Sequence, residues 1–268
     1  MLKKLLKYDL RTMWRFCAPM FIATGLVSVV CCALLYFTIS LSDAEGVFAA
    51  VMMVNGFYAI GILAIVVMTV ISGFMVFYRY YKSMFTDEGY LTMVIPVSTS
   101  TLLNAKLLSS LIFTAIITVV SAVSLCIAVI IPISLNDPSL VASLWKMLKS
   151  VIPALSYGSL EAWVVITVVI RYLLIFVEGV IIMIASITVG AILINKYKLL
   201  GAICMYLAVD LVHSILISIT DFVFILFPDA YYAVAALVSN AIRIVLAAAF
   251  SALLYFLSLH TLKKKLNI

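Results

Sequence analysis

Long apolar stretches, broken by short polar pieces, make up most of the 268 residues. None of these stretches alternates apolar and polar residues over short distances, as the strands of a membrane barrel do. A helix needs about 20 apolar residues to cross a bilayer, and its backbone must hydrogen-bond within its own segment. The pattern therefore predicts an all-α polytopic membrane protein, a single transmembrane domain with six membrane spans, at residues 17–41, 47–77, 107–135, 162–194, 199–227 and 230–259.

The composition favours the same environment. Hydrophobic residues make up 67% of the chain and charged residues 10%. Soluble domains are about 45–50% apolar and about 25% charged. A soluble protein this apolar does not have enough polar groups to cover its own surface, so its main solvent must be lipid.

The basic residues predict the orientation. Six spans place both chain ends on one side, and Lys and Arg mark the cytoplasmic side. With the N-terminus inside, 13 of the 17 Lys and Arg fall in cytoplasmic pieces, Lys146 and Lys149 fall outside, and Arg171 and Arg243 fall within spans. We therefore expect cytoplasmic N- and C-termini. The net charge of +6 then reflects topology rather than nucleic-acid binding, because no soluble domain is left to carry a nucleic-acid surface.

The first segment, residues 1–16, has basic residues at every fourth position (Lys3, Lys7, Arg11 and Arg15), with apolar residues on another side. This spacing predicts an N-terminal amphipathic surface helix on the inner leaflet, with its bases near anionic head groups. The alternative is a basic flank that only sets topology.

Residues 136–159 form the one sizeable outer segment. Its leucines keep helical spacing, and Trp145 suits a membrane–water boundary. The apolar stretch is too short for a seventh span and carries Lys146 and Lys149. We expect an extracellular interfacial segment.

A polar island, residues 79–106, separates the second and third spans. It contains 5 of the 28 charged side chains, which are Arg79, Lys82, Asp87, Glu88 and Lys106. A piece of this size is too small to build its own core. It must therefore pack against the membrane helices or against a partner.

Within the island, the residues from Asp87 to Pro96 predict a short helix. Two acids suit a first helical turn, and Pro96 ends the helix. Ser98 and its neighbours can cap the next helix. Exposed aromatic and aliphatic groups favour a docking surface over a solvated loop. The candidate docking residues are Tyr81, Asp87, Glu88, Gly89, Tyr90, Leu91, Met93, Val94 and Pro96.

The order of these residues resembles the first cytoplasmic loop of type-2 ABC exporter permeases. The shared features are an acidic pair, Gly89-Tyr90-Leu91, Pro96-Val97-Ser98, Leu102-Leu103 and Lys106. The resemblance covers about residues 79–108, and six spans with both ends inside fit the family. It implies that residues 79–106 are a cytoplasmic coupling loop, whose short coupling helix sits in a groove of a separate ATP-binding cassette subunit. It also implies two such subunits below two permease subunits, identical or homologous, in a bacterial cytoplasmic membrane.

The chain contains no G-x-x-x-x-G-K-[ST] phosphate loop. We therefore expect a transport subunit rather than an enzyme, with ATP and Mg²⁺ on the partner chain and neither cofactor nor metal on this one. The resemblance implies export of an amphipathic substrate (peptide, lipid or drug-like) from the cytoplasm or inner leaflet.

Ionisable residues also fall inside the last three spans: Arg171, Glu178, Asp210, His213 and Arg243. A charge at the bilayer centre costs about 2.5–3.5 kcal/mol on insertion scales. Two bases and two acids balance, which predicts mutual pairing, with Asp210 and Arg243 the best match in depth. The pattern leaves open a substrate path, a static brace or a proton relay.

His213 follows Asp210 by three residues, on the same side of a helix. A metal site needs more ligands than this pair, so a hydrogen-bonded histidine in a helix interface is the simpler interpretation. The alternative function is a proton-coupled secondary transporter that uses Glu178, Asp210 and His213. Against it, the sequence shows no internal repeat.

Glycines in the second and fourth spans, at positions 56, 61, 73, 179 and 190, can allow close helix approach.

Overall fold

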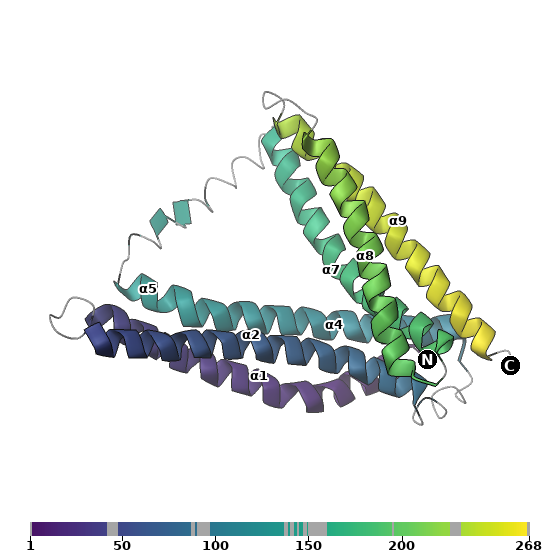
Figure 1. Ribbon diagram of the computed structural model, residues 1–268, viewed down its shortest axis with the longest axis horizontal. Coiled ribbons are helices and arrows are strands. Elements are labelled where there is room, and N and C mark those ends of the chain that lie inside the picture. Colours follow the sequence, from purple (N-terminus) through teal and green to yellow (C-terminus); the bar gives the residue numbers. More distant parts are fainter. Residues whose placement is uncertain are drawn as a thin grey trace. The chain divides into compact units, whose positions relative to one another are not determined.

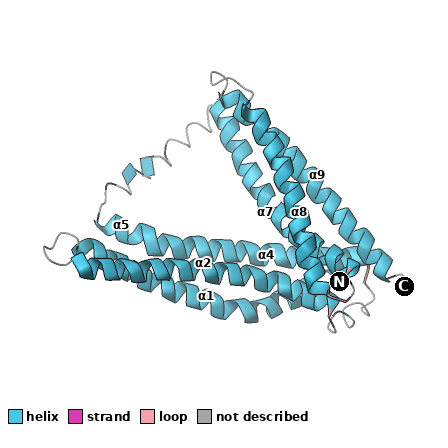
Figure 2. Cartoon of the chain, in the orientation of Figure 1, coloured by secondary structure: helices cyan, strands magenta, loops and turns pink. Residues whose placement is uncertain are grey.

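The computed structural model describes residues 2–41, 48–86, 97–136, 160–194, 196–225 and 232–266, together with Gly89 and six residues between 139 and 149. The regular structure in these ranges is entirely helical, without a strand (Figure 2). The helices are α1 (Leu2–Leu41), α2 (Phe48–Phe85), α4 (Thr99–Leu125), the π-helical turn η1 (Cys126–Ile130), α5 (Ile131–Asn136), α7 (Leu160–Leu193), α8 (Lys198–Ile225) and α9 (Tyr232–Leu266) (Figure 1).

Within the described residues, six helices are long and apolar enough to cross a membrane. They are α1, α2, the continuous run from α4 to α5, α7, α8 and α9. The predicted all-helical fold with six candidate spans is thus confirmed, and it is the architecture of a multi-pass membrane protein.

Several helices extend beyond the apolar runs that predicted them. α1 begins at Leu2 and continues past residue 16 without a break, with Pro19 inside it. α2 runs on to Phe85, and α9 runs on to Leu266. Lysine and arginine are good helix formers, so hydropathy marks where a helix leaves lipid but not where the helix ends.

The third candidate span contains a π-helical turn just before Pro132. In this turn the Ile131 N–H bonds to the carbonyl of Cys126, five residues back. Proline has no N–H, and its ring conflicts with the carbonyl four residues earlier. A wider turn at this point lets the helix continue through proline to Asn136.

The chain divides into two compact units. The N-terminal unit comprises Lys7–Tyr78 and Ile112–Lys149. The C-terminal unit comprises Met1–Leu6, Arg79–Leu111 and Ser150–Ile268. The boundary in α2 falls between Tyr78 and Arg79, so the polar island belongs to the same unit as α7, α8 and α9.

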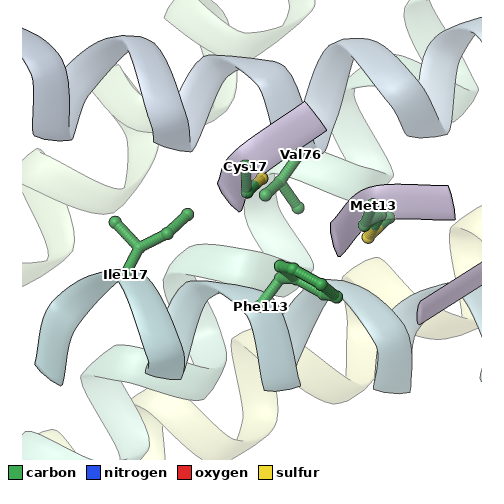
Figure 3. Packing of buried hydrophobic residues seen from close by; sticks show 5 residues of the cluster. All are labelled: Met13, Cys17, Val76, Phe113 and Ile117. Atoms are coloured by element: carbon green, nitrogen blue, oxygen red, sulfur yellow. The ribbon is translucent and has the colours of Figure 1, made fainter. Parts of the chain in front are cut away.

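The N-terminal unit packs α1, α2 and α4 through two buried clusters. Met13 and Cys17 of α1 meet Val76 of α2 and Phe113 and Ile117 of α4 (Figure 3). A second cluster joins Cys31, Ile65 and Ala128. Gly61 lies against the Cys31 side chain, as close approach in the second span requires.

In the C-terminal unit, α7 packs against both α8 and α9, and α8 also contacts α9 (Figure 1). Ile182 and Ala185 of α7 share a core with Val209 of α8 and Leu254 of α9. Gly190 and Gly201 bring the backbones of α7 and α8 together, since a Cβ on either glycine would meet the other's carbonyl oxygen. In contrast, Gly56, Gly73 and Gly179 have no neighbour that a Cβ would meet.

Candidate functional site

The polar island is anchored at its start to α7. Tyr80, near the end of α2, is only 1% exposed. Its hydroxyl oxygen lies 2.6 Å from the hydroxyl oxygen of Thr188 on α7. A buried hydroxyl needs a partner, so this hydrogen bond fixes the end of α2 against α7.

Two more contacts anchor the island to α8 and α9. Lys198, the first residue of α8, donates from Nζ to the carbonyl of Phe85 at 3.0 Å. A cation there satisfies an end carbonyl of α2 and complements the helix dipole. On the other side of the island, the Tyr255 hydroxyl of α9 donates to Oδ1 of Asn104 at 2.8 Å. Residues near both ends of the island are therefore hydrogen-bonded to the C-terminal helices α7, α8 and α9.

Of the predicted docking residues, the structure describes Tyr81 and Gly89. Tyr81 is half-buried and stacks on Phe85, with ring centroids 6.3 Å apart. Gly89 is buried, and its N–H bonds to the carbonyl of Thr86 at 2.8 Å. A Cβ at this glycine would meet the backbone of Met84, so glycine suits the tight turn after α2. The other docking residues lie outside the described part of the chain: Asp87, Glu88, Tyr90, Leu91, Met93, Val94 and Pro96.

The cap predicted after Pro96 is confirmed. Ser98 directly precedes α4, and its Oγ accepts from the Thr101 N–H at 3.4 Å and lies 2.6 Å from the Thr101 hydroxyl. The Leu102 N–H bonds to the Ser98 carbonyl at 3.0 Å. Ser98 is thus the N-cap, as its position before an apolar helix indicates.

The second candidate site lies between α7, α8 and α9, where Glu178 meets His213. Glu178 is 2% exposed. Its Oε1 lies 3.1 Å from Nε2 of His213, an ion-pair distance. The ring N–H is not aligned with this oxygen, so Oε1 accepts no well-formed hydrogen bond from the described residues. The His213 ring also stacks on Phe250 of α9, with centroids 5.7 Å apart.

Two arginines are hydrogen-bonded to neutral partners nearby. Arg171 of α7 donates from Nη1 to Oδ1 of Asn240 at 3.1 Å. Arg243 of α9 donates from Nε to Oγ1 of Thr220 at 3.0 Å. Asn240 is 5% exposed and Thr220 2% exposed, so both acceptors are inside the helix bundle.

These side chains form two layers, because each helix contributes a pair seven residues apart. Arg171, Thr220 and Arg243 make the arginine layer, and Glu178, His213 and Phe250 make the acid layer. Seven residues are about two turns, or about 10 Å. All six side chains line one cavity of about 40 Å³, which is space for roughly two or three waters.

The expected pairing of Asp210 with Arg243 is wrong. Asp210 is exposed, and its carboxylate makes no ion pair with any described residue. α8 and α9 run antiparallel, so the residue level with Arg243 is Thr220. Asp210 lies ten residues from Thr220, about 15 Å along the helix. It also lies about a quarter-turn from the buried face that carries Val209, His213 and Thr220.

Sequence reasoning missed several partners. Asn240 and Thr220 are ordinary polar residues in apolar runs. Only the register of the packed helices shows that they are the hydrogen-bond partners of Arg171 and Arg243. Tyr80 and Thr188 are likewise 108 positions apart. The seven-residue spacing of Arg171 and Glu178 is visible in the sequence and could have indicated the two layers.

Within the described residues, no group of three or more His, Cys, Asp or Glu side chains lies close enough together to hold a metal ion.

Comparisons of this chain with protein-family models, with curated proteins and with solved structures find no match.

Proposed function

We propose that this chain is the membrane-spanning permease subunit of an ATP-driven ABC exporter in a bacterial cytoplasmic membrane. Both termini lie in the cytoplasm, and residues 87–95 form the coupling helix. A separate ATP-binding cassette subunit, in two copies, binds this helix and hydrolyses ATP with Mg²⁺. An amphipathic substrate then leaves the cytoplasm or the inner leaflet.

One observation carries this proposal: the segment that resembles a coupling helix has both flanks fixed to the C-terminal helices. Tyr80 and Phe85 before it bond to Thr188 and Lys198, and Asn104 after it bonds to Tyr255. A force applied to residues 87–95 therefore reaches α7, α8 and α9 through short, directional contacts. An ordinary solvated loop needs no such anchoring.

The exposed face of α8 supports a second permease subunit. Asp210, Ser214 and Ser218 are exposed at every fourth residue, so they form one polar stripe. Asp210 is twelve residues into α8, about 18 Å from its start. A carboxylate at that depth is costly in lipid. A sister subunit or a water-filled path between two subunits would cover this stripe.

The proposal is tested by purifying the chain from native membranes at native expression in mild detergent. We expect an ATP-binding protein to co-purify with it. In the L91D/M93D variant two apolar docking residues become charged, so the expected yield of this companion falls at least about tenfold.

The control is T12D, which places a new charge on a partly exposed position of α1, in the N-terminal unit and not in the unit that contains the island. It should leave the companion in place. Recovery of the ATP-binding protein with L91D/M93D at the wild-type level would contradict docking through the island.

A second candidate function, a proton-coupled secondary transporter, is favoured by the pair of buried Glu178 and partly buried His213. A carboxylate and an imidazole 3.1 Å apart beside a cavity of about 40 Å³ can exchange a proton. Such a transporter would work without a companion protein. Its flux in vesicles would stop when a protonophore collapses the proton gradient, whereas an exporter driven by ATP would continue.

A further inference from the structure

An open groove lies between α1 and α4, within the N-terminal unit. Its lining includes Arg11, Trp14, Arg15, Ile112, Phe113 and Ile116. Its volume is about 470 Å³, and sites for small organic ligands occupy about 300–1,000 Å³. We propose that this groove binds one anionic phospholipid, with the lipid phosphate on the two arginines and an acyl chain along the apolar wall.

The course of α1 places the two arginines at the edge of the bilayer. α1 runs without a break from Leu2 to Leu41, and its apolar run begins at Cys17. Arg15 and Arg11 precede Cys17 by two and six residues, which is about 3 Å and 9 Å along the helix. The head-group layer is about 5–8 Å thick on each side of a bilayer. The arginines therefore lie at the depth of lipid phosphates.

Packing against α4 sets the arginines beside an apolar wall. Met13 and Cys17 of α1 share a buried cluster with Phe113 and Ile117 of α4 (Figure 3). Residues 11–15 of α1 are thus level with this part of α4, which carries no charged residue after Lys106. The α4 side of the groove gives the guanidinium groups no anion, but it buries an alkyl chain favourably.

The two guanidinium groups suit a phosphate. Arg11 and Arg15 are exposed and lie one turn apart on the same side of α1. Each guanidinium is a planar fork of donors that matches two phosphate oxygens. Bases near a membrane surface attract anionic lipids. A phosphatidylcholine carries a cation beside its phosphate, so its net charge is zero. Charge complementarity therefore selects a lipid whose phosphate has no such cation.

Trp14 extends the apolar wall along α1. Its ring meets the ring of Phe21 edge-on, with centroids 6.3 Å apart. Phe21 is seven residues further into the apolar run, about 10 Å along the helix, so the two rings lean towards each other. The Trp14 side chain is 55% exposed and lines the groove. A lipid chain held in the groove would contact it, so Trp14 fluorescence reports whether the groove is occupied.

The test is quenching of Trp14 by lipids with brominated acyl chains. The full chain with W145F and W163F keeps Trp14 as its one tryptophan and is reconstituted in phosphatidylcholine vesicles. Brominated phosphatidylglycerol and brominated phosphatidylcholine are compared at the same low fraction. We expect the binding constant for phosphatidylglycerol to be at least about tenfold higher, as two bases at the surface can supply. Equal quenching by the two lipids would overturn the site.

R11Q/R15Q should abolish the preference for phosphatidylglycerol. The matched control is K3Q/K7Q, which removes two exposed bases with the same spacing from the same helix but outside the groove. It should keep the preference. An equal loss in both double variants would mean a diffuse attraction of anionic lipid to α1, and would refute a discrete site.

The acyl-chain part of the proposal has its own variant. I112F/I116F fills the groove from the α4 side without changing any charge, so Trp14 should lose most of its quenching by phosphatidylglycerol. Wild-type quenching would refute the chain in the groove. A Trp14 that neither lipid quenches would mean that a second copy or another protein covers the groove, which would also overturn the proposal.

This lipid site goes beyond the proposed function and does not depend on it. Trp14 quenching is measured on this chain alone, in vesicles without nucleotide. Recovery of an ATP-binding companion is a separate measurement, so failure of the lipid site leaves the exporter proposal standing.

Discussion

At the scale of single residues, this chain depends on a few polar and small side chains in a mostly apolar bundle. Tyr80 and Thr188 form one buried bond between helices, and Gly190 and Gly201 permit one close backbone contact. Because the hydrophobic effect does not bring helices together inside lipid, such contacts determine which helices pack.

The first residue-scale prediction concerns Gly190→Ala. The added Cβ would meet the backbone of Gly201 and Ala202, which cannot rotate away as a side chain can. Overpacking of this kind costs about 1–3 kcal/mol. The thermal unfolding midpoint of the purified chain in detergent should therefore fall.

Gly179→Ala is the matched control on the same helix, where a Cβ meets nothing within 4 Å. There alanine should be neutral or stabilise by up to about 1 kcal/mol, since it is the better helix former. Equal unfolding midpoints for the two variants would show that α7 and α8 do not touch at Gly190.

The second prediction is a double-mutant cycle on Tyr80→Phe and Thr188→Val. Thr188→Val leaves the Tyr80 hydroxyl buried without that partner, at a cost of about 1–3 kcal/mol. Tyr80→Phe should cost less, because the Thr188 hydroxyl still donates to the Ile184 carbonyl at 2.7 Å. The double variant should cost less than the sum by about 0.5–1.5 kcal/mol. The measurement is the free energy of unfolding in detergent, and strictly additive costs would mean that the two hydroxyls do not interact.

At the scale of helices, the sequence predicted the type and order of the elements well. Apolar runs longer than 20 residues have few alternatives to a membrane helix. It predicted the ends less well, because charged residues such as Arg79 and Lys82 continue α2 beyond its apolar part.

The intramembrane site was predictable in membership but not in pairing. A charge inside a span is visible in the sequence, so Arg171, Glu178, His213 and Arg243 were identified. Their partners depend on the register of antiparallel helices, which hydropathy does not contain. Hence the sequence pairs Asp210 with Arg243 by depth, although the structure places Thr220 beside Arg243.

The polar stripe of α8 gives an element-scale prediction. In a background without the five native cysteines, Ser214→Cys should form an intermolecular cross-link in native membranes. The reason is that Ser214 lies one turn from exposed Asp210, on the face proposed to meet a sister subunit. The product is a band at twice the mass of the chain, or at the summed mass of the chain and a homologous permease subunit.

Leu253→Cys is the control, since Leu253 is 60% exposed on α9. The residues one helical turn away from it, Ala249, Phe250, Phe256 and Leu257, are all apolar, so Leu253 does not lie on a polar stripe. It should react with a membrane-soluble maleimide and remain uncross-linked. A Ser214→Cys variant that labels as freely as Leu253→Cys and stays monomeric would contradict a subunit interface on α8.

At the scale of the whole molecule, the division into two units indicates which helices a force on the island would reach first. The unit boundary crosses α2 just before Arg79, so the flanks of the island belong with α7, α8 and α9. Those helices also carry the arginine and acid layers. A partner that moves the island would act first on the unit that contains these two layers.

Transport by this chain is proposed to use energy supplied by a different chain, and photoaffinity labelling with azido-ATP tests this most directly. The chain is purified from native membranes with whatever accompanies it, labelled, and resolved by mass. We expect the nucleotide on a companion protein and none on this 29.4 kDa chain. Labelling of this chain itself, or a preparation in which no protein takes up ATP while vesicles still transport, would contradict it.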